Sequence, residues 1–176
     1  MIFEETKIKG LFVIEPELLK DERGFFACSW SHTEFEQRGL DGRLVQCNIS
    51  CNHHRGTVRG MHYQEQPYQE AKLVRCTRGA MFDVAIDLRA DSATRYQWVG
   101  VELTSENRRM FYIPKGFAHG YQTLMDNTEI FYQISEYYHA ESARGVRWND
   151  PLFKISWPEK VTCINQRDNT YPDTAR

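Results

Sequence analysis

The stretch LVQCNISCNHHRGTVRGMHYQ, residues 44–64, decides the fold class. Its first part, residues 45–51, alternates apolar and polar side chains, and its last part, residues 59–64, has a similar length. A polar loop from Asn52 to Gly56 separates the two parts. Short segments bounded by a glycine turn are typical of β-strands and fall below the length of an ordinary helix. The stretch therefore predicts two neighbouring strands.

The same pattern continues on the C-terminal side up to residue 134. Turn signals recur at intervals, among them Gly79 after Arg78 and Gly116 after Pro114. Short strands separated at this spacing are typical of an all-β sandwich, jelly roll or barrel. The further predicted strands are residues 72–76, 81–88, 98–103, 110–113, 120–124 and 129–134.

One short helix is predicted after Trp30. Ser31 and Glu34 have the spacing of a capping box, and Gly39 is placed to end the helix. No linker or repeat interrupts the sequence, and 176 residues suit one domain that can bury a sizeable core. We therefore expect a single domain over residues 1–176 with few and short helices.

Composition excludes several classes of protein. The chain is 41% hydrophobic, 26% charged and 13% aromatic, which excludes a disordered, coiled-coil or collagen-like chain. A formal net charge of -2 argues against a nucleic-acid partner, since such proteins carry a basic excess. No apolar run approaches the ~18 residues of a membrane span. The start, MIFEETKIKG, lacks the apolar region of a signal peptide, so we expect a cytoplasmic protein.

The five cysteines do not suggest a disulfide framework, because their number is odd and no C-x-x-C occurs. We expect reduced thiols that mostly serve as small core residues. They are Cys28, Cys47, Cys51, Cys76 and Cys163.

Side-chain alternation separates the two faces of the predicted strand 45–51. Gln46, Asn48 and Ser50 share one face and Cys47 and Ile49 lie on the other. The polar face either meets solvent, as in half-buried antiparallel strands, or lines a polar cavity inside a barrel. Alternation alone leaves these two interpretations open.

The predicted strand 129–134 differs from it. Tyr132 lies between Ile130 and Ile134 on an apolar face, where its hydroxyl needs a hydrogen-bond partner.

Two histidines lie in recognisable frames. The patterns Gly56-x5-His62 and Pro114-x-Gly116-x-x-His119 resemble the two sequence boxes of the cupin family. In metal-binding cupins the first box carries H-x-H, whereas this chain has His62-Tyr63-Gln64. A catalytic metal needs three or four convergent ligands, so the resemblance predicts a cupin-like jelly-roll barrel without a metal site.

A fuller resemblance extends over nearly the whole chain. The matching stretches occur in order, and together they are similar to the dTDP-4-dehydrorhamnose 3,5-epimerases, a metal-free branch of the cupin fold. They are DERGFF (21–26), QCNIS (46–50), RGMHYQ (59–64), AKLVR (71–75), RGAMFDVAIDLR (78–89), IPKGFAHGY (113–121), EIFYQISEYY (129–138), RWNDP (147–151) and QRDNTYP (166–172).

The resemblance implies an isomerase without a cofactor. Its substrate would be dTDP-4-dehydro-6-deoxy-D-glucose, and its product dTDP-4-dehydro-L-rhamnose, on the route to dTDP-L-rhamnose for cell-surface polysaccharides. The C4 ketone acidifies the protons on C3 and C5, so each epimerisation passes through an enolate. The site therefore needs a base on one face, an acid on the other and positive charge near the enolate oxygen.

The resemblance also suggests which residues are catalytic. His62 is the expected base, and Asp168 the carboxylate that orients it. Tyr132 is the expected acid, and Lys72 the cation beside the ketone oxygen. From the residues alone, His62 reads equally as a core histidine and Asp168 as a turn residue. Asp83 is a further carboxylate that could bind a site histidine.

Substrate-binding positions follow from the same resemblance. Pyrophosphate is bound by guanidinium and amide donors, and aromatic rings stack on the base or sugar. The segment that carries Arg23 and Phe26 is expected to reach the neighbouring subunit's site, which implies a homodimer. The expected binding residues are Arg23, Phe26, Gln46, Asn48, Arg59, His119, Tyr138 and Arg167.

Two positions depart from the family pattern and leave other functions open. Cys28 stands where a glutamate is common, which leaves the nucleobase open, and Gln133 stands where many members have lysine. A relative that inverts only C3 or only C5 would share the same motifs. A metal-dependent cupin oxygenase or isomerase and a non-catalytic sugar-nucleotide-binding protein are further alternatives.

Overall fold

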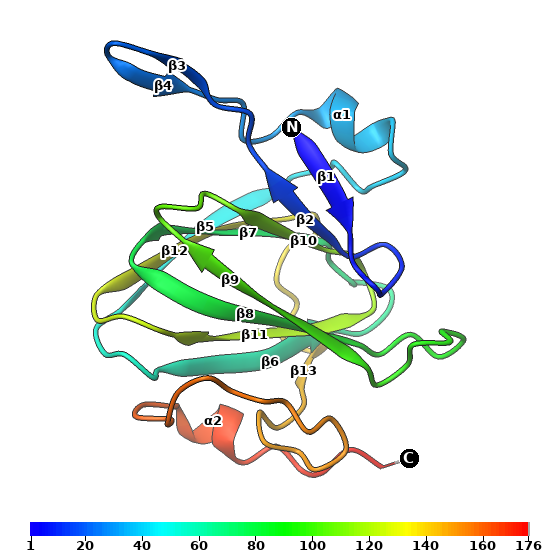
Figure 1. The fold of residues 1–176 in the computed structure, drawn as a ribbon. Helices are drawn as coiled ribbons and strands as arrows, with labels where there is room; N and C mark the ends of the chain where they lie inside the picture. Colours follow the sequence, from blue (N-terminus) through cyan, green and yellow to red (C-terminus); the bar gives the residue numbers. More distant parts are fainter. Residues whose placement is uncertain (176) are drawn as a thin grey trace.

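Two antiparallel β-sheets face each other and enclose the interior of the molecule (Figure 1). The computed structural model describes residues 1–175. The six-stranded sheet has the order β1 (Ile2–Glu5), β2 (Phe12–Glu15), β10 (Met110–Ile113), β7 (Lys72–Arg78), β12 (Thr128–Ile134) and β5 (Gln46–Asn52). The five-stranded sheet has the order β13 (Ala143–Gly145), β6 (Val58–Gln64), β11 (Phe117–Thr123), β8 (Ala80–Asp87) and β9 (Trp98–Thr104). This is the predicted cupin-like jelly roll.

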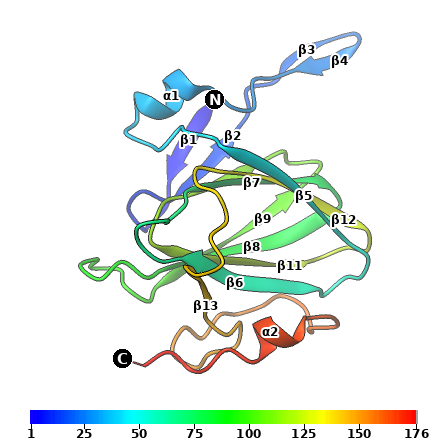
Figure 2. The same cartoon turned by 180° about the vertical axis from the view of Figure 1, so that it is seen from behind.

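Three short elements lie outside the two sheets. Strands β3 (Leu19–Asp21) and β4 (Gly24–Phe26) form a hairpin that projects from the body in both views (Figures 1 and 2). Helix α1 (His32–Glu36) lies near β1, and helix α2 (Gln166–Asn169) lies below the five-stranded sheet in Figure 1. Within residues 1–175, no helix has the length and apolar character needed to span a membrane.

Every strand predicted between residues 45 and 134 is present. The predictions missed β1 to β4 and β13, which are three or four residues long and carry no clear alternation. In the predicted helix, Ser31 Oγ accepts a hydrogen bond from the Glu34 N–H at 3.4 Å. The second half of the capping box is absent among the described residues, because the Glu34 carboxylate binds the amino group of Met1 instead.

An apolar core fills the space between the sheets. Its fully buried members come from both sheets and from the loop between β1 and β2. Two smaller clusters cover the outer faces, where Phe35 of α1 packs on the six-stranded sheet and Phe153 packs on the five-stranded sheet. The central core includes Ile8, Leu11, Val74, Met81, Leu103, Phe111 and Ile130.

The prediction that the cysteines mostly fill the core is wrong. All five are free thiols, but Cys76 is the one that is buried, and burial raises its pKa to about 11. Cys47 and Cys51 are exposed because β5 turns its apolar face outward, with Ile49 between them 68% exposed. Cys28 and Cys163 are exposed as well.

Strands β6 and β11 approach each other closely beside His62 and His119. A Cβ on Gly60 would lie 2.5 Å from the Gly120 Cα, and Gly60 has a φ of +125°. A Cβ on Gly120 would lie 2.7 Å from the Arg59 carbonyl oxygen. Both glycines are therefore required by space, and they set the position of the neighbouring His62 and His119.

We expect Gly60→Ala to destabilise the protein more than Gly24→Ala. Both residues have a φ near +125°, so each substitution adds a backbone cost of about 1–3 kcal/mol. Gly24 has no atom within 4 Å of its added Cβ, whereas Gly60 also incurs ~1–3 kcal/mol of overpacking. Urea unfolding at one protein concentration measures the difference. Equal losses of stability would contradict the close approach.

Candidate active site

A cavity of about 400 Å³ opens between the two sheets. The six-stranded sheet contributes residues from β5, β7 and β12, and the five-stranded sheet contributes residues from β6 and β13. The cavity brings together most of the residues proposed from the sequence. Its lining is Gln46, Asn48, His62, Tyr63, Gln64, Glu70, Lys72, Tyr132, Ile134, Tyr138, Ala143, Arg144 and Arg167.

The polar face of β5 lines this cavity and does not face solvent. Gln46 Nε2 donates to Asn48 Oδ1 at 2.7 Å, and both side chains border the cavity. Further along the strand, Ser50 shares a hydrogen bond of 3.0 Å with the Tyr121 hydroxyl inside the barrel. The structure thus decides between the two interpretations of the alternation in favour of an internal polar surface.

His62 and Asp168 form a hydrogen-bonded pair. His62 Nε2 lies 2.7 Å from Asp168 Oδ1, and the Gly60 N–H donates to Asp168 Oδ2 at 3.0 Å. Burial opposes ionisation of Asp168, but the hydrogen bonds from His62 and Gly60 outweigh it and lower the pKa of the carboxyl. The ionised carboxylate selects the Nε2–H tautomer of His62, which leaves Nδ1 as the basic nitrogen.

The local structure of the C-terminal segment places Asp168 beside His62. The residue lies in α2 and not in the turn that its neighbours suggest. The Asn165 side chain caps this helix by accepting the Asp168 N–H at 2.7 Å. Strand β13 pairs with residues 62–64 of β6, which leaves the Gly60 N–H free for Asp168.

Tyr132 and Lys72 face the cavity from the opposite sheet. They lie on the adjacent strands β12 and β7, while His62 lies on β6. Burial raises the pKa of Tyr132, and nearby Arg59 lowers it by less, so the phenol is protonated at neutral pH. Among the described residues, none forms a hydrogen bond with the Tyr132 hydroxyl. The predicted partner for this hydroxyl is therefore not found among residues 1–175.

A second histidine–carboxylate pair lies behind His62. His119 is the register partner of His62 on β11, and its Nε2 lies 2.5 Å from Asp83 Oδ1. Asp83 is fully buried, and its other carboxylate oxygen has no hydrogen-bond partner within the part of the chain described. His119 is 8% exposed and does not border the cavity, so it supports the wall behind His62.

The sequence predictions missed Gln64, Glu70 and Arg144 among the lining residues. Gln64 donates to the carbonyls of Tyr68 and Tyr137, at 2.8 and 3.0 Å, and accepts the His139 N–H. It thereby joins the two loops at the mouth of the cavity. Alternation would have identified Gln64 and Glu70, since they lie two residues from His62 and Lys72 respectively.

Besides His119, three more of the proposed binding residues do not line this cavity. Arg23 and Phe26 lie on the projecting hairpin, where Phe26 is 71% exposed and Arg23 pairs with Asp21. Arg59 donates to Asn52 Oδ1 at 2.8 Å beside the cavity. Just beyond the hairpin, the exposed Cys28 thiol lies 3.2 Å from the Trp30 carbonyl oxygen.

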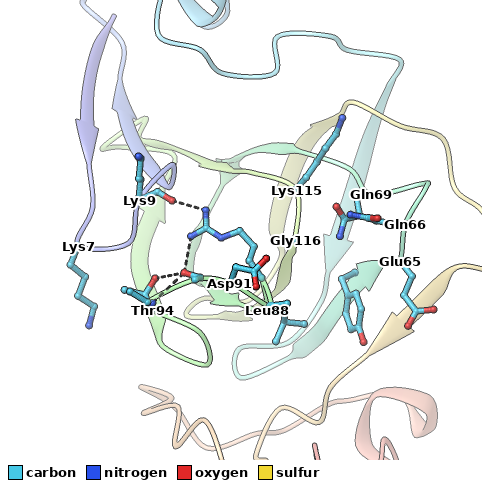
Figure 3. Close-up of a pocket in the computed structure, with 15 residues that line it drawn as sticks. Lys7, Lys9, Glu65, Gln66, Gln69, Leu88, Asp91, Thr94, Lys115 and Gly116 are labelled. Carbon is cyan, nitrogen blue, oxygen red and sulfur yellow. Dashed lines mark hydrogen bonds between the residues drawn. The ribbon is translucent and has the colours of Figure 1, made fainter. Parts of the chain in front are cut away.

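A larger depression of about 850 Å³ holds none of the proposed residues (Figure 3). Two of its four basic side chains form ion pairs: Arg89 pairs with Asp87, and Lys115 pairs with Asp41 at 2.9 Å. Burial opposes ionisation of Asp87, but hydrogen bonds from Arg89, Ser92 and others outweigh it and lower its pKa to about 2. This network fixes the loop after β8, and among the described residues no histidine lines the depression.

Within residues 1–175, no group of three or more His, Cys, Asp and Glu side chains is placed to hold a metal ion. His62 and His119 each bind their own carboxylate, and Gln64 is engaged by backbone groups. The site thus consists of acid–base and cationic groups on two facing sheets.

The fold and the site together define a cupin-like jelly roll with acid–base residues inside its barrel. The family profile described as dTDP-4-dehydrorhamnose 3,5-epimerase matches residues 5–176, and the chain belongs to this family. The predicted family, fold and class of enzyme are thereby confirmed.

Similar proteins carry related names. The dTDP-4-dehydrorhamnose 3,5-epimerase of Sinorhizobium fredii is 42% identical, over 98% of this chain and 89% of its own length. A dTDP-6-deoxy-D-glucose-3,5-epimerase from Legionella pneumophila, solved in complex with dTDP-4-keto-L-rhamnose, is 42% identical with a TM-score of 0.88, covering 95% and 89% of the two chains. A dTDP-4-dehydrorhamnose 3-epimerase of Streptomyces niveus is 38% identical, over 92% of this chain and 78% of its own length.

We expect Asp168→Asn to lower the free energy of unfolding at pH 7 by about 1.5–3 kcal/mol, through loss of a charged hydrogen bond. The pKa of Asp168 is lower in the folded state than its ordinary value of 3.8. Its contribution is therefore present above pH 3.8 and is lost as the pH falls through the lower folded value. Urea unfolding of both proteins from pH 7 down to pH 3 should show the gap closing. The matched control is Asp91→Asn, a change at an exposed carboxylate; a gap that stays constant with pH would contradict this account.

Proposed function

We propose that this chain epimerises both C3 and C5 of dTDP-4-dehydro-6-deoxy-D-glucose and that His62 is the base. One observation carries the proposal: His62, held by Asp168, and Tyr132, which lacks a partner among residues 1–175, face one cavity from opposite sheets. A sugar ring bound between the two sheets would have a base on one face and an acid on the other. Inversion of a carbon centre requires that arrangement.

In the proposed mechanism the C4 ketone makes the adjacent C–H bonds acidic. His62 Nδ1 takes the proton from carbon, and the electron pair moves to the C4 oxygen to form an enolate. Asp168 stabilises the imidazolium that results, because its carboxylate accepts the Nε2–H. Tyr132 then gives its phenolic proton to the opposite face of the same carbon, and the ketone is restored.

Two features fit Tyr132 to the role of the acid. Its raised pKa keeps the proton on the phenol until it is needed. The phenol is also half-buried, so few waters compete to return a proton to the wrong face. The same pair would act at C3 and again at C5, with proton exchange between the two steps.

The cations around the cavity suit an anionic substrate. Lys72, on the same sheet as Tyr132, would stabilise the enolate oxygen. Arg167 of α2 borders the cavity beside Tyr138, and the amides of Gln46 and Asn48 add further donors. These groups are suited to bind a diphosphate and a stacked nucleobase.

The projecting hairpin supports a homodimer. Arg23 is exposed in the turn between β3 and β4, and Phe26 is exposed on β4. The outward face of β5 likewise exposes Ile49. A second copy of the chain would cover this apolar face, and each hairpin would supply Arg23 and Phe26 to the neighbouring site.

Epimerisation of a single carbon is the second candidate. One of the similar proteins is named a 3-epimerase, and the cavity residues would serve a single inversion equally well. The two reactions differ in the number of carbon-bound protons exchanged with solvent.

We expect two deuterons in the product when the reaction runs in deuterated water with dTDP-4-dehydro-6-deoxy-D-glucose. Each inversion returns a solvent-derived proton to carbon, so mass spectrometry of the sugar counts the inversions. One deuteron would establish the single epimerase, and none would remove the epimerase proposal. In His62→Ala, exchange should be lost while dTDP binding is retained, and His53→Ala, at an exposed loop histidine, should exchange as wild type does.

Mixed dimers test the reach of the hairpin. His62→Ala and the double variant Arg23→Ala/Phe26→Ala should each be inactive alone. Co-expressed, they should regain about a quarter of wild-type exchange, since half of the dimers are mixed and each mixed dimer has one intact site. No recovery in mixed dimers would mean that each hairpin serves its own subunit.

A further inference from the structure

Glu70 is a cavity residue with no role in the mechanism above. It lies in the segment that leads into β7, two residues before Lys72. Ala71 between them is 3% exposed and faces the outer cluster, so Glu70 and Lys72 both turn toward the cavity. Ser135 fixes this segment on both sides: its Oγ accepts the Ala71 N–H at 2.8 Å, and its N–H donates to the Ala71 carbonyl at 3.0 Å.

Glu70 and Lys72 form a buried ion pair. Lys72 Nζ lies 3.1 Å from Glu70 Oε1, and the two side chains are 12% and 9% exposed. An ammonium removed from water in this way is costly unless a counter-charge accompanies it. No other carboxylate lines the cavity, within the described chain, that could take this role.

Only one of the two oxygens of the Glu70 carboxylate has a polar partner among the described residues. Glu70 Oε2 is buried and has no hydrogen-bond partner within residues 1–175. A glutamate kept solely to stabilise the fold would normally engage both oxygens. Here one oxygen is committed to Lys72, so the contact with the ammonium is the one polar interaction of the Glu70 carboxylate among the described residues.

We propose that Glu70 is the positioning residue of Lys72, whose ammonium it holds against the cavity wall where the enolate oxygen develops. This inference rests on the function proposed for Lys72. In the free protein the pair is neutral. When substrate binds, the enolate becomes a second anion for an ammonium that is already charged and oriented, so no reorganisation is needed at the moment of reaction.

Removal of the Glu70 charge should therefore lower the rate of epimerisation and leave substrate binding unchanged. Glu70 forms its ion pair with Lys72 and no hydrogen bond or ion pair with the proposed nucleotide-binding residues among residues 1–175, so its loss should leave the affinity for dTDP unchanged. The charge of Glu70 acts only through Lys72, so its removal should matter only while Lys72 is present. A double-mutant cycle measures such dependence directly.

The experiment compares wild type, Glu70→Gln, Lys72→Met and the double variant by the rate of deuterium incorporation. Glu70→Gln keeps the size of the side chain and removes its charge. We expect it to slow exchange about tenfold or more in wild type, with kcat falling and KM nearly unchanged, and to have no effect in the Lys72→Met background. Glu159→Gln, which removes the carboxylate of the distant Arg55–Glu159 ion pair, is the matched control and should exchange at the wild-type rate.

Several results would overturn the proposal. Exchange by Glu70→Gln at the wild-type rate would show that the charge is not needed. An equal slowing in both backgrounds, or full activity of Lys72→Met, would show that Glu70 does not act through Lys72. If the double variant is too slow to measure, a crystal structure of Glu70→Ala decides: a displaced Lys72 ammonium supports the proposal and an unmoved one overturns it.

A different result would show that the proposed function is wrong. If the chain is not an epimerase, the wild-type protein itself incorporates no deuterium, whereas the wild-type protein stays active if only the Glu70 proposal is wrong.

Discussion

The hydrogen bond between His62 and Asp168 is the interaction on which the rest of the site depends. It joins residues 106 positions apart, and the same carboxylate also holds the Gly60 N–H. A fully buried carboxylate without these donors would be strongly unfavourable in the interior. Docking of α2 and the orientation of His62 therefore depend on each other. His62 has this carboxylate partner only when the C-terminal segment is in place.

Strand β5 shows how the barrel keeps a polar interior. Burial of apolar surface alone would turn Ile49 and its neighbours inward. The opposite orientation is sustained because the inward groups pair with one another or with the opposite sheet, as Ser50 does with Tyr121. One end of the barrel is therefore packed with apolar side chains, and the other is a cavity lined by amides, a base and cations. The same orientation leaves an apolar outer face, which the proposed homodimer would cover.

The sequence predicted the strands correctly where turn residues and segment length alone determine them. The strands between residues 45 and 134 were predicted because turns bound them and their lengths are typical. Strands β1 to β4 and β13 were missed because each is only three or four residues long. Strands β2 and β13 also pair with strands far along the chain, β10 and β6 respectively. The capping box was half right, since the Met1 amino group captures Glu34. The cysteines were misplaced because composition does not say which face of a strand is buried. Glu70 went unnoticed although it shares the alternation of Lys72.

The sequence by itself determined the class of fold, the family and the chemical types available for a reaction. Motifs and turn residues are local, and their order along the chain is enough to identify a relative. Only the tertiary structure decided which of these residues meet. It brought Asp168 to His62, put Tyr132 and Lys72 on the wall opposite His62, paired Lys72 with Glu70 and placed Arg23 and Phe26 away from their own cavity. The reason is that hydrogen bonds and charge pairs act over a few ångströms, and the positions they join are fixed by how the two sheets pack.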